Sequence, residues 1–392
     1  MSRTIFLLDI DCFFASVEMA LHPELCGKPV CVGGRRDDRG IVACPNYEAR
    51  AYGVRTAMPL RTAARLLPPD AVFVPGSHKL YGEYSDRVME VLEEFTPDIE
   101  QVSIDEAYMD VTGCLHFWRN AEQMAATMKE RIRSTCGLSV SIGIASNKVC
   151  AKIAAGLRKP DGLVTVPHGA EREFLIPLPV EVVPGIGPKT QPKLNARGIM
   201  TVGDLLSSSW GRETHIGQYL TAIIKGQHES ILHYDRVEQS ISRDTTFGED
   251  TADREFVMAT LYYLAERCCK ALRKRQQRAL TVTVKIRYAD FTTIQRQTTF
   301  RLPTAQEEDV FGIARSLCST LLFPHRLVRL VGVKVSGLLP ADGRGSQMEL
   351  GVVASEKLGV LHNRLDALQE KHGYGTIHWG ITHTLDRWKP RE

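Results

Sequence analysis

The sequence predicts an α+β catalytic core followed by further domains, and three observations lead to this prediction. The chain has 392 residues, which is enough for two to four domains. Short apolar runs alternate with amphipathic helical segments over residues 4–157, in an order that suits mixed, partly antiparallel strands. Carboxylates follow two of these runs: Asp9 and Asp11 after residues 5–8, and Asp105 and Glu106 after residues 99–102.

The elements of the first half follow from apolar periodicity and from proline stops. Strands are expected at residues 4–9, 30–34, 40–43 and 138–145, and a strand pair over 100–111 that is interrupted at the acidic dipeptide. Helices are expected at residues 13–21, 46–52, 60–67, 80–95, 121–135 and 148–157.

Residues 166–230 have a different character and resemble a helix-hairpin-helix. A turn with Gly185, Gly187 and Lys189 precedes one expected helix, and a second helix begins at Val202. Backbone N–H groups left free in such a turn can bind a DNA phosphate without reading bases. A glycine-rich turn with no ligand is the alternative, and the flanking helices with Lys189 favour DNA.

Beyond an expected linker at residues 231–242, the order is strand, helix, strand, strand, helix, strand, which predicts a four-stranded sheet with two helices. Polar and apolar residues alternate over 281–287, as in a sheet with one solvated face. A final amphipathic helix is expected at 353–368. The solvated face is expected to carry Thr281, Thr283, Lys285 and Arg287, extended by Arg296 and Arg301.

Charge is unevenly distributed, which points to a polyanionic partner. Residues 241–340 hold 16 Lys/Arg against 10 Asp/Glu, a net of +6, while the whole chain carries only +3. A basic region beside an acidic site favours nucleic acid, and a solvated basic surface is the alternative.

Composition excludes several other classes of protein. Hydrophobic residues make up 43% of the chain and charged residues 24%, as in ordinary globular proteins. The ten cysteines include no Cys-x-x-Cys pair, so a zinc knuckle is not expected and a reducing compartment fits. No signal peptide and no run of about 18 apolar residues is found. We therefore expect a cytoplasmic protein without a membrane span.

The acidic residues are the first group that indicates chemistry. Hard oxygen ligands gathered at strand ends suit magnesium that also holds a phosphate, which favours two-metal phosphoryl or nucleotidyl transfer. Asp9, Asp105 and Glu106 form the expected site. For Asp11, the cap of the helix that follows is the favoured interpretation.

Residues 46–54 and 148–162 carry the groups that could hold an anion. Tyr47 and Arg50 lie three apart and share a helix face, where a hydroxyl and a guanidinium can hold a phosphate chain. A surface ion pair of Arg50 with Glu48 is the alternative. Lys159 lies just past a helix end and could reach into a cleft.

Several motifs in the same order resemble the Y-family of translesion DNA polymerases, closest to its DinB-like branch. The matching stretches are residues 8–18, 46–54, 103–108, 146–154 and 159–162, and the similarity covers nearly the whole chain. The resemblance implies a right-hand polymerase: palm and fingers at 1–165, with the fingers inserted at about 20–75, a thumb at 166–230, the linker at 231–242, a DNA-binding little finger at 243–340 and a tail at 341–392.

The resemblance also implies site residues and ligands. Two Mg²⁺ ions, with Mn²⁺ able to substitute, would be held by Asp9, Asp105, Glu106 and the Ile10 carbonyl. Tyr47, Arg50, Lys159 and the Phe13 backbone N–H would grip the triphosphate of a deoxynucleotide. Phe14 matches a steric gate, whose ring would collide with a ribose 2′-hydroxyl. For Phe13, core packing is an alternative.

Partners and rivals complete the expectations. The partners implied are primer–template DNA, deoxynucleoside triphosphates and a sliding clamp, and a monomer is expected. A degenerate clamp-binding peptide is found at Gln347, Met348 and Leu350, with a plain connector as the alternative. Cys44-Pro45 stands where relatives commonly have a hydroxyl residue, which puts one phosphate contact in doubt. The rival functions are a catalytically inactive DNA- or clamp-binding homologue and a palm-fold nucleotidyl cyclase.

Overall fold

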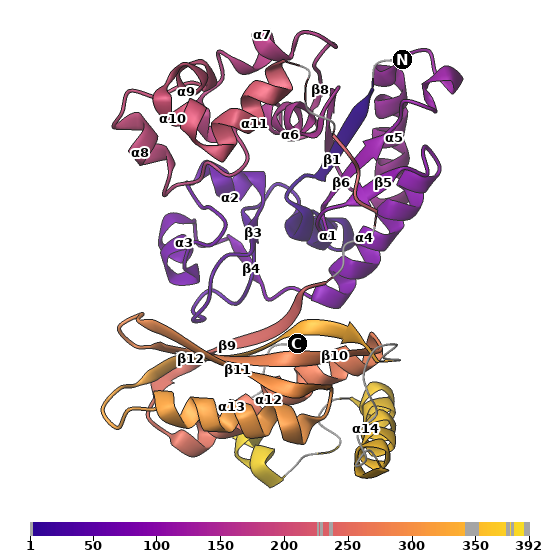
Figure 1. The fold of residues 1–392 in the computed structure, drawn as a ribbon. Coiled ribbons are helices and arrows are strands. Elements are labelled where there is room, and N and C mark those ends of the chain that lie inside the picture. Colours follow the sequence, from indigo (N-terminus) through magenta and orange to yellow (C-terminus); the bar gives the residue numbers. More distant parts are fainter. Residues whose placement is uncertain are drawn as a thin grey trace. The chain divides into compact units, whose positions relative to one another are not determined.

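Two compact units make up the chain in the computed structural model, residues 1–235 and 236–392. The structure describes residues 3–225, 227, 230–234, 238–341, 353–373, 377 and 380–387. Figure 1 shows the elements of each unit, coloured along the sequence. No helix within these described ranges is both long and apolar enough to cross a membrane.

A mixed five-stranded sheet forms the centre of the first unit, in the order β5-β6-β1-β7-β8. Strand β1 pairs antiparallel with β6 and β7, β5 pairs antiparallel with β6, and β7 pairs parallel with β8. The strands are β1 Ile5–Ile10, β5 Ile99–Gln101, β6 Glu106–Asp110, β7 Val140–Ala145 and β8 Leu163–Thr165.

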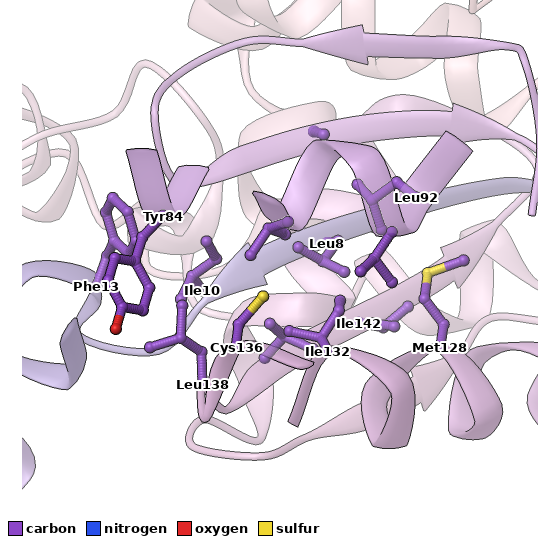
Figure 2. Close-up of a cluster of buried hydrophobic side chains, with 14 of the residues drawn as sticks. Leu8, Ile10, Phe13, Tyr84, Leu92, Met128, Ile132, Cys136, Leu138 and Ile142 are labelled. Carbon is purple, nitrogen blue, oxygen red and sulfur yellow. The ribbon is translucent and has the colours of Figure 1, made fainter. Parts of the chain in front are cut away.

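Alternate residues of β1 enter two hydrophobic clusters, so this central strand is apolar almost throughout. Leu8 and Ile10 pack with three helices on one face, as Figure 2 shows. Ile5 and Leu7 pack with α6 on the other face. The helices on these faces are α1 Phe13–Leu21, α4 His78–Glu93 and α5 Ala121–Cys136 on the first, and α6 Lys148–Leu157 on the second; a short 3₁₀ turn, η2, spans Leu115–Phe117.

A small three-stranded sheet, ordered β3-β2-β4, lies between α1 and α4 in the sequence. The strand expected at residues 40–43 is instead found at 44–45, and the one expected at 30–34 ends at Val32. Gly33 has φ +139°, and a Cβ there would overlap the backbone of Ile41, so the chain turns away after Val32. The elements are η1 Pro23–Leu25, β2 Val30–Val32, β3 Cys44–Pro45, α2 Tyr47–Ala51, α3 Leu60–Leu66 and β4 Val72–Val74.

Short helices follow the five-stranded sheet, and they share the hydrophobic cluster of α6. The turn expected to bind phosphate is exposed at Gly185 and Gly187, while Ile186 between them is 4% exposed and anchors it. Gly185 has φ +96°, which favours glycine there. The elements are α7 Glu171–Leu175, η3 Val180–Val182, α8 Gln191–Asn195, α9 Val202–Ser207, α10 Ser209–Glu213 and α11 His215–Ile224.

The second unit is a four-stranded antiparallel sheet, ordered β11-β10-β12-β9, with two helices packed on one face. Val282, Val284 and Ile286 of β10 enter the core beneath these helices, so the predicted alternation is found. The elements are β9 Ser240–Thr251, α12 Arg254–Lys274, β10 Gln277–Tyr288, β11 Thr293–Thr304, α13 Glu307–Leu321 and β12 Val328–Pro340.

The opposite face of this sheet differs from the expected one at two residues. Thr283 is only 7% exposed, because its short side chain lies on a central strand between longer neighbours. Arg296 pairs in register with Val284, so it lies on the helix-covered side. The expectation that Arg296 extends the solvated face is therefore wrong, although its side chain is exposed at the sheet edge.

The C-terminal segment packs back onto the second unit through buried charges. Arg273 of α12 is paired with Glu307 of α13 at 2.7 Å and with Asp366 of α14 at 2.7 Å. The helix expected at 353–368 is α14, Val353–His372, and a 3₁₀ helix, η5, follows at Gly380–Arg387. Asp366 thus ties this last long helix to the sheet-and-helix layer.

Candidate active site

Three carboxylates meet where β1 ends and β6 begins. Asp9 lies directly opposite Glu106 in the antiparallel register of these strands. Asp105 precedes β6, and its carbonyl accepts a hydrogen bond from the Ile10 N–H at 2.9 Å. The two segments that the sequence singled out therefore adjoin at one edge of the buried sheet.

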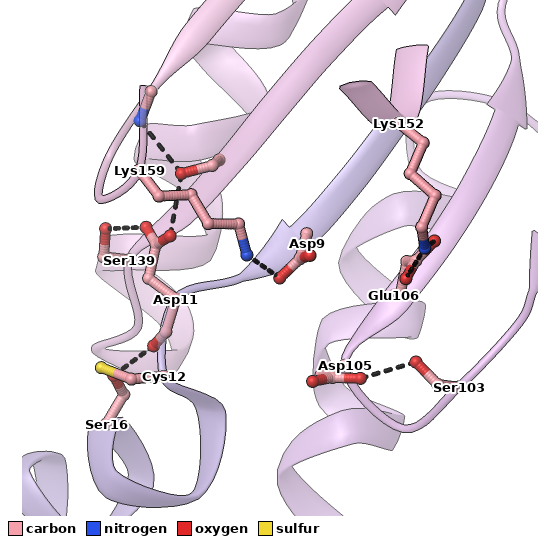
Figure 3. A network of polar contacts seen from close by, with 12 residues as sticks. Asp9, Asp11, Cys12, Ser16, Ser103, Asp105, Glu106, Ser139, Lys152 and Lys159 are labelled. Atoms are coloured by element: carbon pink, nitrogen blue, oxygen red, sulfur yellow. Dashed lines mark hydrogen bonds and ion pairs between the residues drawn. The ribbon is translucent and has the colours of Figure 1, made fainter. Parts of the chain in front are cut away.

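Each of these carboxylates has a polar partner, as Figure 3 shows. Lys159 forms an ion pair with Asp9. Lys152 Nζ lies 2.6 Å from both oxygens of Glu106. The Ser103 hydroxyl donates to Asp105 at 2.6 Å. Two lysines and one serine thus bind the three acidic groups.

The acidic groups also act on one another. Burial raises the pKa of Asp9, Lys159 lowers it, and the nearby Asp105 and Glu106 carboxylates raise it again, with a net upward shift. The three carboxyl groups therefore disfavour one another's charge, and a bound cation would relieve this repulsion.

The donor set fits hard divalent ions, although the side chains as placed do not form a finished metal cluster. Oxygen-only ligands are what Mg²⁺ prefers in phosphate chemistry. Among the described residues, no three acidic, histidine or cysteine side chains converge on one metal position. Lys159 and Lys152 hold two of the carboxylates instead. Metal binding would require these carboxylates to exchange a lysine partner for an ion.

Lys152 is a site residue that sequence reasoning did not single out, because its place depends on helix packing. Its helix, α6, lies close on β7, where a Cβ at Gly143 would overlap the Ala151 carbonyl. This close approach brings Lys152 within reach of Glu106 on β6, which lies beyond β1 in the sheet. The sequence signal for this close packing was a glycine on the strand, Gly143, facing a helix rich in small residues.

Tyr47 and Arg50 lie on α2, which begins at the Asn46 cap. The Arg50 guanidinium lies 5.3 Å from the Tyr47 ring centre, and its Nε donates to the Pro45 carbonyl at 3.0 Å. The two side chains therefore share one face, as their spacing predicts. Burial is the main cause of the raised pKa of Tyr47, so its hydroxyl stays a neutral donor.

Asp11 is not the helix cap that the sequence suggested. The residue that caps α1 is Cys12, and its side chain makes no capping bond. Asp11 is only 1% exposed, and its carboxylate accepts hydrogen bonds from Ser139 and Ser141 at 2.9 and 2.8 Å. Its role is structural, but the partners are long-range ones that a single sequence does not reveal.

Phe14 and Phe13 begin α1 but have different surroundings. The Phe14 ring stacks on Tyr81 with centres 4.3 Å apart and planes 14° apart. Tyr81 in turn donates its hydroxyl to the buried Glu18 at 2.6 Å. Phe13 is 2% exposed and belongs to the core in Figure 2. The packing alternative for the Phe13 side chain is therefore found, while Phe14 stays half-buried.

Three family models match the chain in succession. The impB/mucB/samB family matches residues 8–156, the IMS family HHH motif matches 168–199, and the impB/mucB/samB family C-terminal domain matches 238–350. A DNA polymerase IV of Dehalococcoides mccartyi (strain CBDB1) is 41% identical over 98% of this chain and 98% of its own. A DNA polymerase IV of Listeria monocytogenes serotype 4b is 36% identical over 89% and 99%.

Solved structures agree with these relatives. A Y-family DNA polymerase chimera of Dbh and Dpo4 superposes with a TM-score of 0.78 at 30% identity, over 86% of this chain and 99% of its own. An insertion ternary complex of Dbh DNA polymerase has a TM-score of 0.58 at 30% identity, over the same shares. This chain belongs to the Y family of DNA polymerases, in its DinB-like branch.

Family membership confirms the predicted fold class and makes this chain a translesion DNA polymerase, a DNA-directed nucleotidyltransferase. Y-family polymerases depend on divalent metal ions, which agrees with the oxygen-only donor set. The rival functions, an inactive homologue and a nucleotidyl cyclase, are not favoured.

The other residues predicted to contact DNA or a clamp belong to separate elements of the chain. Lys189 is exposed beside the Gly185–Gly187 turn. In the second unit, Lys285 is paired with Asp244, and Arg287 donates to Thr293 at 2.9 Å. Arg301 is exposed on β11. The clamp peptide at Gln347, Met348 and Leu350 lies outside the described residues.

Proposed function

We propose that this polymerase adds deoxynucleotides to a primer 3′ end at Asp9, Asp105 and Glu106, with low processivity and low fidelity. The observation that carries this proposal is the in-register pair of Asp9 and Glu106, with Asp105 beside it, at one edge of the buried sheet. All three carboxylates are present, so this chain lacks the losses expected of an inactive homologue.

The carboxylates would hold two Mg²⁺ ions, with Mn²⁺ able to substitute and the Ile10 carbonyl as a further ligand. Bound metal would supply a Lewis acid that lowers the pKa of the primer hydroxyl and neutralises phosphate charge. Lys159 and Lys152, which now pair with Asp9 and Glu106, would then be released. Lys159 would be the cation available to hold the triphosphate.

The protein's own groups orient the nucleotide. Tyr47 and Arg50 offer a hydroxyl and a guanidinium on one face of α2, and Arg binds phosphate oxygens through a fork of donors. The Phe13 N–H at the start of α1 would add a backbone donor. Phe14, supported by the Tyr81 ring, would exclude a ribose 2′-hydroxyl by contact.

Each domain would have the role that its counterpart has in a right-hand polymerase. Residues 1–165 would act as palm and fingers, 166–230 as thumb, 231–242 as linker and 243–340 as little finger, followed by the tail. Gly185, Gly187 and Lys189 would contact duplex phosphates, as would Lys285, Arg287 and Arg301 on the open face of the sheet. Arg296 is left out of this set, because its side chain lies on the helix-covered side of the sheet.

The partners proposed are primer–template DNA and deoxynucleoside triphosphates. Solved relatives include an insertion ternary complex of Dbh DNA polymerase, which supports this choice for the present chain. A monomer in the bacterial cytoplasm, joined to a sliding clamp through Gln347, Met348 and Leu350, completes the proposal.

Primer extension tests the proposed function directly. Purified protein with Mg²⁺, a primed template and all four deoxynucleotides should extend the primer by a few nucleotides per binding event. It should also extend the primer past a damaged template base. A primer that stays unextended, with the protein folded and bound to DNA, would refute the polymerase assignment. A cyclase would instead convert a nucleoside triphosphate without any template.

A further inference from the structure

One buried carboxylate close to the active site has no place in the proposed metal site. Asp11 is 1% exposed, and four groups donate hydrogen bonds to it. Its Oδ2 accepts from the Ser139 hydroxyl at 2.9 Å and from the Asp161 N–H at 2.8 Å. Its Oδ1 accepts from the Ser141 hydroxyl at 2.8 Å and from the Tyr47 hydroxyl at 3.4 Å.

These donors come from the segments that carry the proposed triphosphate contacts. Tyr47 is itself one of those contacts, and Asp161 belongs to the turn that begins with Lys159. Asp11 lies two residues beyond Asp9, the carboxylate with which Lys159 is paired. One buried group therefore links the end of β1 to both sides of the proposed phosphate site.

The Lys159 turn is held from its other side as well, so its position is strongly determined. Asp161 forms ion pairs with Lys129 at 3.0 Å and Arg133 at 2.7 Å, both on α5. The Gly162 N–H donates to the Ser141 hydroxyl at 3.1 Å, and that hydroxyl donates onward to Asp11. The turn is thus fixed between α5 and the Asp11 carboxylate.

The orientation of Asp11 separates it from the metal ligands. In the view of Figure 3, Asp11 faces Ser139 on the side of Asp9 away from Asp105. A carboxyl group in so buried a place needs hydrogen-bond partners, and the four donors supply them. Asp11 is almost fully buried and faces away from Asp105, unlike the partly exposed Asp9 and Glu106, so we do not assign it as a metal ligand.

We propose that Asp11 is a positioning residue that holds the Tyr47 hydroxyl and the Lys159 turn at the spacing the incoming triphosphate requires. The inference rests on the proposed function, because it assigns Tyr47 and Lys159 to the nucleotide. Asp11 touches neither substrate nor metal, and it acts through the two groups it holds.

Three single variants test this role in the full-length protein. Asp11→Ala removes every acceptor, and Asp11→Asn keeps the shape and one acceptor oxygen. Asp110→Asn is the control, since Asp110 is a partly buried carboxylate of the same sheet, held by Arg3 at 2.6 Å and Thr112 at 2.6 Å. It lies opposite Ile5, at the far end of β1 from the site.

The expected results separate positioning from general stability. Asp11→Ala should raise the KM for deoxynucleotide about tenfold or more while kcat falls less, and Asp11→Asn should restore part of the affinity. Asp110→Asn should leave this KM within about twofold of wild type even if its Tm falls. Tyr47→Phe should raise KM in the wild-type background but add little to Asp11→Ala.

The contrary outcomes are equally distinct. An unchanged KM in folded Asp11→Asn and Asp11→Ala, or an equal rise in Asp110→Asn, would overturn the positioning role. If Asp11→Ala does not fold, Asp11→Asn and the double variant Asp11→Asn/Tyr47→Phe decide the question. Effects of the two substitutions on KM that are fully additive would count against the proposal. A wild-type protein that extends no primer would refute the proposed function instead.

Discussion

Asp9 and Glu106 lie directly opposite one another on the antiparallel strands β1 and β6. Each is bound by a lysine from a different segment, Lys159 for Asp9 and Lys152 for Glu106. Because opposed carboxylates in a buried sheet repel, their paired cations are part of what keeps this arrangement stable. The same repulsion prepares the pair to accept divalent ions.

Replacement of Asp105 separates catalysis from DNA binding. Asp105→Ala should reduce primer extension by about 10³-fold or more, because a proposed metal ligand is lost where charge develops in the transition state. DNA affinity should change little, since the proposed DNA contacts are made by other residues. Single-turnover extension and fluorescence anisotropy with labelled DNA measure the two effects. Ser103→Ala, which removes only the 2.6 Å bond to Asp105, is the control and should keep most activity.

The proposed sugar gate, Phe14, stacks on a second ring, Tyr81. Phe14→Ala should raise the incorporation of ribonucleotides relative to deoxynucleotides by about tenfold or more, because the contact with the 2′-hydroxyl is lost. Tyr81→Ala should weaken selection in the same direction, since the Phe14 ring lies on Tyr81 at 4.3 Å. Tyr81→Phe keeps the ring and loses only the bond to Glu18, so its selectivity should match wild type. Unaltered sugar preference in Phe14→Ala would refute the gate.

Sequence reasoning reached the carboxylates because a buried strand that ends in acidic residues is an unusual pattern with a chemical explanation. The apolar run before Asp9 predicted a strand over residues 4–9, and the strand found there is Ile5–Ile10. It failed at Arg296 because β11 carries polar residues on both faces, so nothing in the sequence fixes which face each side chain takes. It also missed the partners of Asp11, because Ser139 and Asp161 approach it only in the folded sheet.

On the open face of the second unit, an acidic partner neutralises the charge of Lys285. Lys285 on β10 and Asp244 on β9 form an ion pair across Gly332 of β12, where a Cβ would overlap the Asp244 carboxylate. Asp244→Asn should therefore free Lys285 and tighten DNA binding about threefold to tenfold at low salt. The slope of log affinity against log salt should steepen by about one.

A charge-matched control distinguishes the local pair from net charge. Glu255→Gln removes the same charge from an exposed position in the first turn of α12, on the helix side of the sheet. It should change DNA affinity less than Asp244→Asn, and titrations of labelled duplex at several salt concentrations make the comparison. Equal effects of the two variants would mean that only net charge matters.

The segment that leaves the first unit is anchored on Glu100, and this contact predicts a pH dependence. Burial raises the pKa of Glu100, but hydrogen bonds from the Lys148 ammonium and the His233 N–H lower it by more. The net shift of the Glu100 pKa is therefore downward. A carboxyl with a lowered folded pKa stabilises the fold above its unfolded value near 4.5, and this contribution is lost as the pH falls through the folded pKa. Glu100→Gln should cost about 3 kcal/mol at pH 7, because Lys148 loses its buried partner. The difference in unfolding free energy between this variant and wild type should shrink below about pH 4.5. Hydrogen exchange of the His233 amide should be faster in the variant at neutral pH.

Glu94→Gln is the control, because Glu94 forms an exposed pair with Arg131. It should cost at most about 0.5 kcal/mol, and a similar loss in both variants would contradict the anchoring role of Glu100.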